Sequence, residues 1–263
     1  MRRSLIILML LLAFAYGCSS ATGGTETGNT TAVSIRVIGY QSSQLAALDL
    51  PALAVDSLEV DTAFIVLDRL RFRPFSICNA DVEDEGADDI QFDGPFIVDL
   101  LHPEALSGLE DVEIPTGRYC RVELVLKKLE APGPMSNRSV LIQGSRADDV
   151  PFRMTTEVDE EFELQSDETG FVIEAAAPLS VFFIAFDLDQ WFNGVDLMDT
   201  FIEVSTGGSG EPIILINDTK NQNVQEMIEE NIKRSADLFE DSDDDEELDP
   251  EEEEDSLAEG TLP

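Results

Sequence analysis

The sequence predicts a mainly β protein with the architecture of an antiparallel β-sandwich, and three observations predict it. Segments in which apolar and polar residues alternate recur along most of the chain. Gly, Pro and Asp separate these segments, as turns between strands require. Apolar residues make up 43% of the sequence and include 15 Phe, so a large core can form. Many short strands with this punctuation are typical of two packed sheets.

The clearest strand covers residues 118–129. Val122, Leu124 and Leu126 share one face while charged residues share the other, which predicts a half-buried antiparallel strand. Residues 179–192 are apolar on both faces, which predicts a strand that is buried on both sides. Further strands are expected at 32–40, 61–75, 96–101, 139–144, 150–154, 160–165, 170–176, 201–205 and 212–217.

The domain formed by these strands spans residues 32–218, and the pattern changes after it. Apolar residues from Val224 to Phe239 recur at helical spacing, which predicts one amphipathic helix over residues 221–240 that packs against the sheets. Residues 241–263 are dominated by acids and contain no core-forming segment. Like charges at this density repel one another, so we expect a disordered acidic tail.

The first residues have the pattern of an export signal. Two Arg precede an apolar run that is too short for a permanent membrane-spanning helix, so residues 1–17 are expected to be a lipoprotein signal peptide. Gly17-Cys18 resembles a bacterial lipobox, in which the Cys sulfur takes a diacylglycerol. We therefore expect lipidation at Cys18, with palmitate-type chains as the membrane anchor; the alternative is a plain secretory signal that leaves a free thiol.

The same region also predicts a linker and a cellular location. Residues 18–31 are small and polar, which predicts a flexible tether between the lipid and the folded domain. The expected location is the bacterial cell envelope, and Ser19 after the Cys favours the outer membrane.

The charge of the chain limits its partners. The sequence holds 55 acidic residues against 16 Lys and Arg, which gives a formal net charge of −39. Such a charge excludes nucleic acid and anionic lipid as partners of the folded part. Cations or a cationic protein remain as partners, and solvation alone is the simplest role for the acids.

Cys78 and Cys120 remain as a pair once Cys18 is assigned to lipid. In an oxidising compartment an even number of Cys favours a disulfide, whereas two buried thiols are the alternative. On the chain-entropy model the bridge would stabilise the fold by about 4 kcal/mol.

Three stretches, residues 61–74, 113–128 and 177–192, carry a recognisable pattern. In order they give an apolar strand, the turn Pro115-Thr116-Gly117-Arg118-Tyr119 leading into a strand, and a strand that ends in Phe186-Asp187-Leu188-Asp189. In this order the chain resembles a domain-of-unknown-function family of bacterial lipoproteins. The resemblance implies an Ig-like or transthyretin-like sandwich, related to carboxypeptidase-regulatory-like domains, and it brings no catalytic residues.

Few residues are suited to catalysis. The single His, His102, follows a strand and precedes a Pro, which fits a surface position better than a catalytic base. His and Cys are too few for a zinc site, and the sequence has neither a phosphate-binding loop nor a nucleophile elbow. We therefore expect a protein that is not an enzyme.

Calcium is the one cofactor that the composition favours, because Ca²⁺ takes carboxylate and carbonyl oxygens. Residues 187–191 after a buried strand are one candidate, and residues 241–252 are another through an EF-hand-like spacing that lacks the required Gly. The third candidate is the acidic loop over residues 81–89. Its expected ligands are Asp81, Glu83, Asp84, Asp88 and Asp89.

These observations favour a lipid-anchored envelope protein that acts as a non-enzymatic binding or interaction module. The acidic loop and the tail are its expected contact surfaces. Two alternatives remain. One is a carboxylate-based hydrolase of envelope polysaccharide, which needs two carboxylates in one cleft, and the other is a structural spacer without a ligand.

Overall fold

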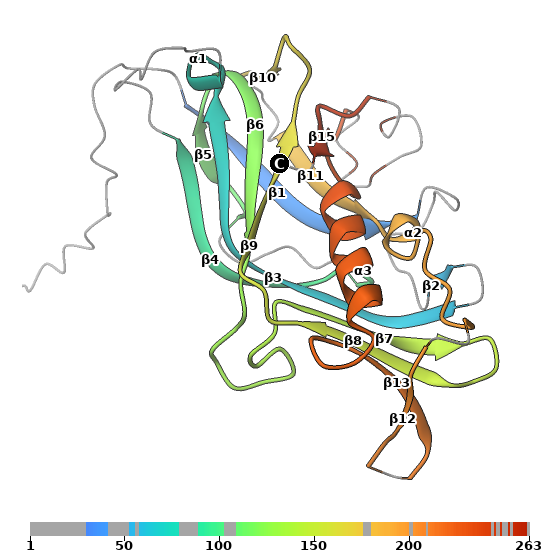
Figure 1. Ribbon diagram of the computed structural model, residues 1–263. Helices are drawn as coiled ribbons and strands as arrows, with labels where there is room; N and C mark the ends of the chain where they lie inside the picture. The colour runs from blue at the N-terminus through green and yellow to red at the C-terminus, as the bar shows by residue number, and fades with distance from the viewer. Residues whose placement is uncertain are drawn as a thin grey trace, which may run out of the picture.

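The chain folds into strands that are joined in a single sheet (Figure 1). The computed structural model describes residues 30–41, 53–55, 58–78, 89–102, 109–175, 180–199, 202–208, 210–242, 245, 248, 252 and 255–261. The strands in this part of the chain are β1 (Thr30–Tyr40), β2 (Leu53–Val55), β3 (Leu58–Pro74), β4 (Ile90–Asp99), β5 (Val112–Pro115), β6 (Gly117–Leu126), β7 (Val140–Arg146), β8 (Pro151–Thr156), β9 (Glu160–Gln165), β10 (Phe171–Ile173), β11 (Ser180–Asp187), β12 (Val204–Thr206), β13 (Pro212–Ile216), β14 (Ala236–Glu240) and β15 (Ala258–Thr261). The helices described over their full length are α1 (Phe75–Cys78), α2 (Leu188–Trp191) and α3 (Gln222–Arg234).

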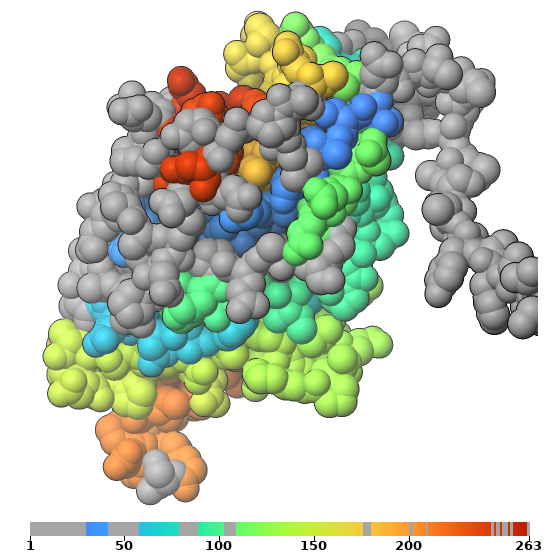
Figure 2. Space-filling model, turned by 180° about the vertical axis from the view of Figure 1, so that it is seen from behind, coloured from blue at the N-terminus to red at the C-terminus, as the bar shows by residue number. Residues whose placement is uncertain are grey.

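The main path of the sheet runs β12-β13-β8-β7-β3-β6-β9-β15-β14-β11-β1-β5. In addition, β2 and β4 pair with β3, and β10 pairs with β6. Seen from behind, β1 (blue) lies beside β5 (green), and the hairpin of β12 and β13 (orange) projects beyond β7 and β8 (Figure 2). The prediction of a mainly β fold is therefore confirmed.

The prediction of a purely antiparallel arrangement is wrong, because the sheet is mixed. β1 is parallel to β11, and β13 is parallel to β8. Alternation of apolar and polar residues indicates the two faces of a strand, but it does not indicate whether the neighbouring strand is parallel or antiparallel. The first and the eleventh strand are far apart in the chain, so no short turn between them reveals their pairing in the sequence.

β3 is the hub of the sheet. It pairs with β6 and β7 along one side and with β2 and β4 along the other. Beyond β4, the N–H of Leu100 donates to the carbonyl oxygen of Ala63, and the N–H of Gly39 on β1 donates to the carbonyl oxygen of Leu100. These bonds bring β1 back towards β3, so the sheet curls around its apolar face. Gly39 permits the approach, because a Cβ there would lie 2.6 Å from the Leu100 oxygen.

The inner face of the curl holds the main core. Phe162 on β9 packs edge-on against Phe186 on β11, which in turn packs edge-on against Trp191 on α2. The indole N–H of Trp191 donates to the Ser235 hydroxyl at 2.8 Å, so its polar atom is paired despite its burial. The sheet has two arms, one with β3, β6 and β9 and the other with β14, β11 and β1. The core therefore joins side chains from both arms.

A second apolar cluster lies on the outer face of β1, β11 and β14. It consists of Ile38, Tyr40, Val181, Phe183, Ala185, Phe239 and Leu248. Because apolar side chains lie on both of its faces, β11 is buried on both sides, as its sequence predicted. Leu248 belongs to the segment that was expected to be a disordered tail, and it is buried here.

The C-terminal segment departs from the sequence prediction. The amphipathic helix is present as α3, but the prediction that it extends to residue 240 is wrong, since residues 236–240 form β14. Leu238 and Phe239 fit either a helix face or the two faces of a strand, so the pattern alone misassigned them. The prediction of disorder is also wrong for residues 258–261, which form β15. A four-residue strand that buries only its Ala lacks the apolar alternation that predicts strands.

Candidate functional site

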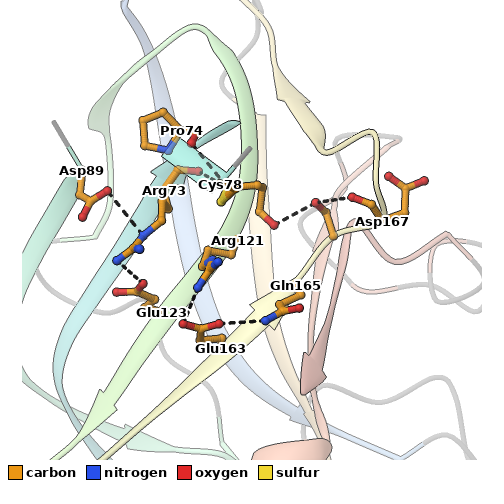
Figure 3. Close-up of a disulfide and its surroundings, with 11 residues drawn as sticks. Arg73, Pro74, Cys78, Asp89, Arg121, Glu123, Glu163, Gln165 and Asp167 are labelled. Carbon is orange, nitrogen blue, oxygen red and sulfur yellow. Dashed lines mark hydrogen bonds and ion pairs between the residues drawn. A yellow bond between two sulfur atoms is a disulfide. The ribbon is translucent and has the colours of Figure 1, made fainter. Parts of the chain in front are cut away.

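Most residues expected in a site lie outside the described part of the chain. They are Cys18, Asp81, Glu83, Asp84 and Asp88. Asp89, Cys78 and Cys120 are described, and all three lie around the C-terminal end of β3 (Figure 3).

The disulfide between Cys78 and Cys120 is present, as predicted from the pair of Cys that remains once Cys18 is assigned to lipid. Cys78 ends α1, which directly follows β3, and Cys120 lies on β6 beside the end of β3. Their Cα atoms are 6.3 Å apart, within the usual range. The bridge therefore fixes α1 against β6 at the edge of the site.

A buried carboxylate lies next to this bridge. Glu123 on β6 is only 2% exposed. One of its oxygens accepts a hydrogen bond from the guanidinium group of Arg71 at 2.6 Å, and the other forms an ion pair with the guanidinium group of Arg73 at 2.5 Å. The Asp89 carboxylate lies 3.7 to 3.8 Å from the same two Arg side chains. Burial raises the pKa of Glu123, while the charges of Arg73 and Arg71 act in the opposite direction.

The pattern of alternating charges continues onto the next strand. Arg121 on β6 donates to the Glu163 carboxylate on β9 at 2.6 Å, and the Gln165 amide donates to the same carboxylate at 2.9 Å (Figure 3). We call the outward residues of β3, β6 and β9, together with the residue before β4, the charged face. It consists of Arg71, Arg73, Asp89, Arg121, Glu123 and Glu163.

The sequence carries part of the signal for the charged face. Alternation on β3 and β6 indicates which residues point outwards, but only the register places Arg71 opposite Glu123. Cross-strand pairs of opposite charge stabilise a sheet, so the charged face has a structural effect of its own.

Two hollows lie at the end of β9, and both are lined by residues 165–167. One has a volume of about 190 Å³ and includes the disulfide and Arg121 in its wall. The other has a volume of about 330 Å³ and is lined on its far side by residues 256–259 and Thr261 of the C-terminal strand region. Residues 165–167 therefore lie between the disulfide and the region of β15.

A second group of acids lies where β14 meets β15. Asp237 is opposite Glu259, and its carboxylate accepts the N–H of Gly260 and, at 3.4 Å, the hydroxyl of Tyr40. Burial is the largest influence and raises the pKa of Asp237 to about 6; the charges of Glu259 and Asp187 also raise it, and the two hydrogen bonds lower it.

The described residues do not include a group of three or more His, Cys, Asp or Glu side chains placed to share a metal ion. In the candidate at residues 187–191, the Asp187 carboxylate instead accepts the N–H of Asp189 and the amide of Gln190, and so caps α2. In the candidate at residues 241–252, the Glu252 carboxylate accepts the N–H of Ser242.

His102 is half exposed and lies 3.4 Å from the Asp99 carboxylate, at the surface position that its sequence context predicted. Within the ranges that the structure describes, none of the helices combines the length and apolarity needed to span a bilayer.

No protein-family model matches this chain, and no curated protein or solved structure matches it either. The functional conclusion therefore depends on the residues themselves.

The disulfide is expected to contribute strongly to stability. Replacing both Cys78 and Cys120 by Ser removes a cross-link between residues 42 positions apart. We expect the free energy of unfolding to fall by about 4 kcal/mol, because the unfolded chain regains the entropy of the open loop. Urea unfolding measures the change, and reduction of the wild-type protein should produce a similar loss. A loss below about 1 kcal/mol would contradict a stabilising role.

Asp237 is expected to make stability depend on pH. Its pKa is higher in the folded state than its ordinary value of 3.8, so the folded state binds the proton more tightly. The resulting stabilisation is fully present below about pH 4 and is lost as the pH rises through about 6. Relative to Asp237→Asn, the wild-type protein should lose on the order of 2 kcal/mol between pH 4 and 7. Urea unfolding across this range measures the difference, and parallel curves for the two proteins would refute the assignment.

Proposed function

We propose that this protein is a lipid-anchored, non-enzymatic binding module of a bacterial cell envelope. In this proposal, Cys18 carries the lipid, and the tether ends before Thr30, because Thr30 and Thr31 belong to β1 and pair with β5. The curled sheet is the binding domain, with its two arms facing each other across the core as in a β-sandwich. The lipobox-like Gly17-Cys18 after a short apolar run supports the anchor.

The observation that carries the binding role is the pairing of charges on the charged face. Glu123 is held between Arg71 and Arg73, and Glu163 is held by Arg121. A glycoside hydrolase instead needs two carboxylates that face the same substrate bond across a cleft. Glu123 is buried and fixes the two Arg side chains in place, whereas Arg73, Arg121 and Glu163 stay partly exposed. These exposed groups form a surface of defined charges, which suits recognition of a charged partner.

The chemistry of the partner follows from the total charge. A formal net charge of −39 favours a cation or a cationic protein and disfavours nucleic acid. The hollow of about 190 Å³ between the disulfide and residues 165–168 offers a place for a cationic side chain, because Asp167 and Glu168 line it and the guanidinium of Arg121, which also lines it, is paired with Glu163. The membrane is then a partner only through the lipid.

The anchor is tested by Cys18→Ser, with Ser19→Ala as the matched control. In cells fed an alkyne-labelled palmitate, we expect the wild-type protein and the Ser19→Ala variant to carry the label and to sediment with membranes. The Cys18→Ser variant should carry no label, because the sulfur that forms the thioether is absent. Label on Cys18→Ser, or no label on the wild-type protein, would refute the anchor.

Calcium binding by Asp81, Glu83, Asp84, Asp88 and Asp89 stays a prediction. Asp89 already lies beside two guanidinium groups, so an ion would draw its ligands mainly from the other four acids. We expect millimolar Ca²⁺, but not Mg²⁺, to raise the melting temperature. Replacing the four acids by their amides should abolish the rise, whereas Asp89→Asn should retain it. Equal melting temperatures with Ca²⁺ and EDTA would exclude calcium.

A further inference from the structure

The last strand that the structure describes, β15, occupies an interior position in the sheet. β15 lies between β9 and β14, so removing it would leave two open edges that face each other. Residues 241–257 connect β14 to β15, although an antiparallel pair can be joined by about 2–5 residues. Fully extended, this connection spans more than about 50 Å. It is therefore long enough to carry β15 to a neighbouring molecule.

Main-chain pairing supplies most of the contacts of β15. Residues 259–261 pair with β9, and residues 258–259 pair with β14. Ala258 is the one side chain of this strand in the core, where it is 2% exposed. Recognition through backbone hydrogen bonds on sheet edges gives the affinity of peptides that add a strand to a sheet, and pockets for individual side chains give the specificity.

One position of the strand nevertheless demands a particular residue. A Cβ on Gly260 would lie 2.5 Å from the carbonyl oxygen of Lys233 and 2.9 Å from that of Ala236. Both atoms are backbone, at the end of α3 and the start of β14, so neither can move without shifting an element. The gap between β9 and β14 therefore accepts a strand with a small residue followed, two positions later, by Gly.

A charge conflict weakens the hold on β15. Glu259 on β15 lies directly opposite the partly buried Asp237 on β14. Like charges opposite each other on neighbouring strands are destabilising. A short strand with one core side chain and this conflict can leave the sheet more easily than strands with longer ladders.

We propose that the gap between β9 and β14 is a strand-acceptor site, and that its external occupant is the C-terminal strand of a second copy of this chain. A second copy supplies the required Ala258 and Gly260 with the same contacts that the resident strand makes. The connection over residues 241–257 supplies the reach, and its Leu248 leaves the outer apolar cluster during the exchange. The inference does not depend on the lipid anchor or on the proposed charged partner.

The acceptor site is tested with the protein of residues 19–263, into which a specific protease site is introduced between Leu248 and Glu252. After cleavage, a fluorescein-labelled peptide of residues 252–263 is added, and its anisotropy is followed. We expect the peptide to replace the resident fragment. A matched Gly260→Val peptide should bind at least tenfold more weakly, and a Glu259→Gln peptide several-fold more tightly. Equal binding of the wild-type and Gly260→Val peptides, or no binding of either, overturns the proposal.

The identity of the occupant is tested on uncut chains. Two preparations with different affinity tags are mixed at high concentration, warmed below the melting temperature and cooled. We expect capture of one tag to recover the other, and an excess of the 252–263 peptide to suppress this recovery. The Gly260→Val peptide should not suppress it. If no mixed species forms, the second copy is not the occupant and the proposal fails.

Discussion

The insertion of β15 between β9 and β14 is the constraint on which the rest of the structure depends. β9 belongs to the arm that contains β3 and β6, and β14 belongs to the arm that contains β11 and β1. The strand joins both arms through backbone ladders, and the packing of Phe162 on β9 against Phe186 on β11 requires the arms to face each other. The four residues that end the described chain therefore complete both the sheet and the core.

The charged face and the junction of β14 and β15 have opposite effects on stability. On the charged face, Glu123 and Glu163 lie against guanidinium groups, so the strands that carry them are held in register. At the junction of β14 and β15, Asp237 lies opposite another acid, and burial raises its pKa to about 6. The first arrangement stabilises a rigid surface near the disulfide. The second weakens the strand that completes the sheet, which is why exchange of that strand is the expected weak point of the fold.

The sequence predicts those parts of the structure whose signal is local. Residues 180–187 show the double burial that an unbroken apolar run indicates, and the turn before β6 is fixed by the Tyr119 hydroxyl, which donates to the Pro115 carbonyl at 2.6 Å. The disulfide followed from the number of Cys and the expected compartment. Parallel pairing, β15 and the position of Glu123 could not be predicted, because each depends on contacts between residues that are far apart in the chain. The proposed lipid site and most of the acidic loop lie outside the described residues, so their predictions remain open.

Hydrogen exchange of the backbone amides of residues 258–261 tests the central claim most directly. If β15 completes the sheet, these amides should exchange much more slowly than amides of an unstructured peptide, because the strand pairs with β9 and β14. Their protection should be lower than that of β6, since β15 is short and faces a charge conflict. Exchange at the rate of an unstructured peptide would show that residues 258–261 are not part of the sheet and would contradict the account.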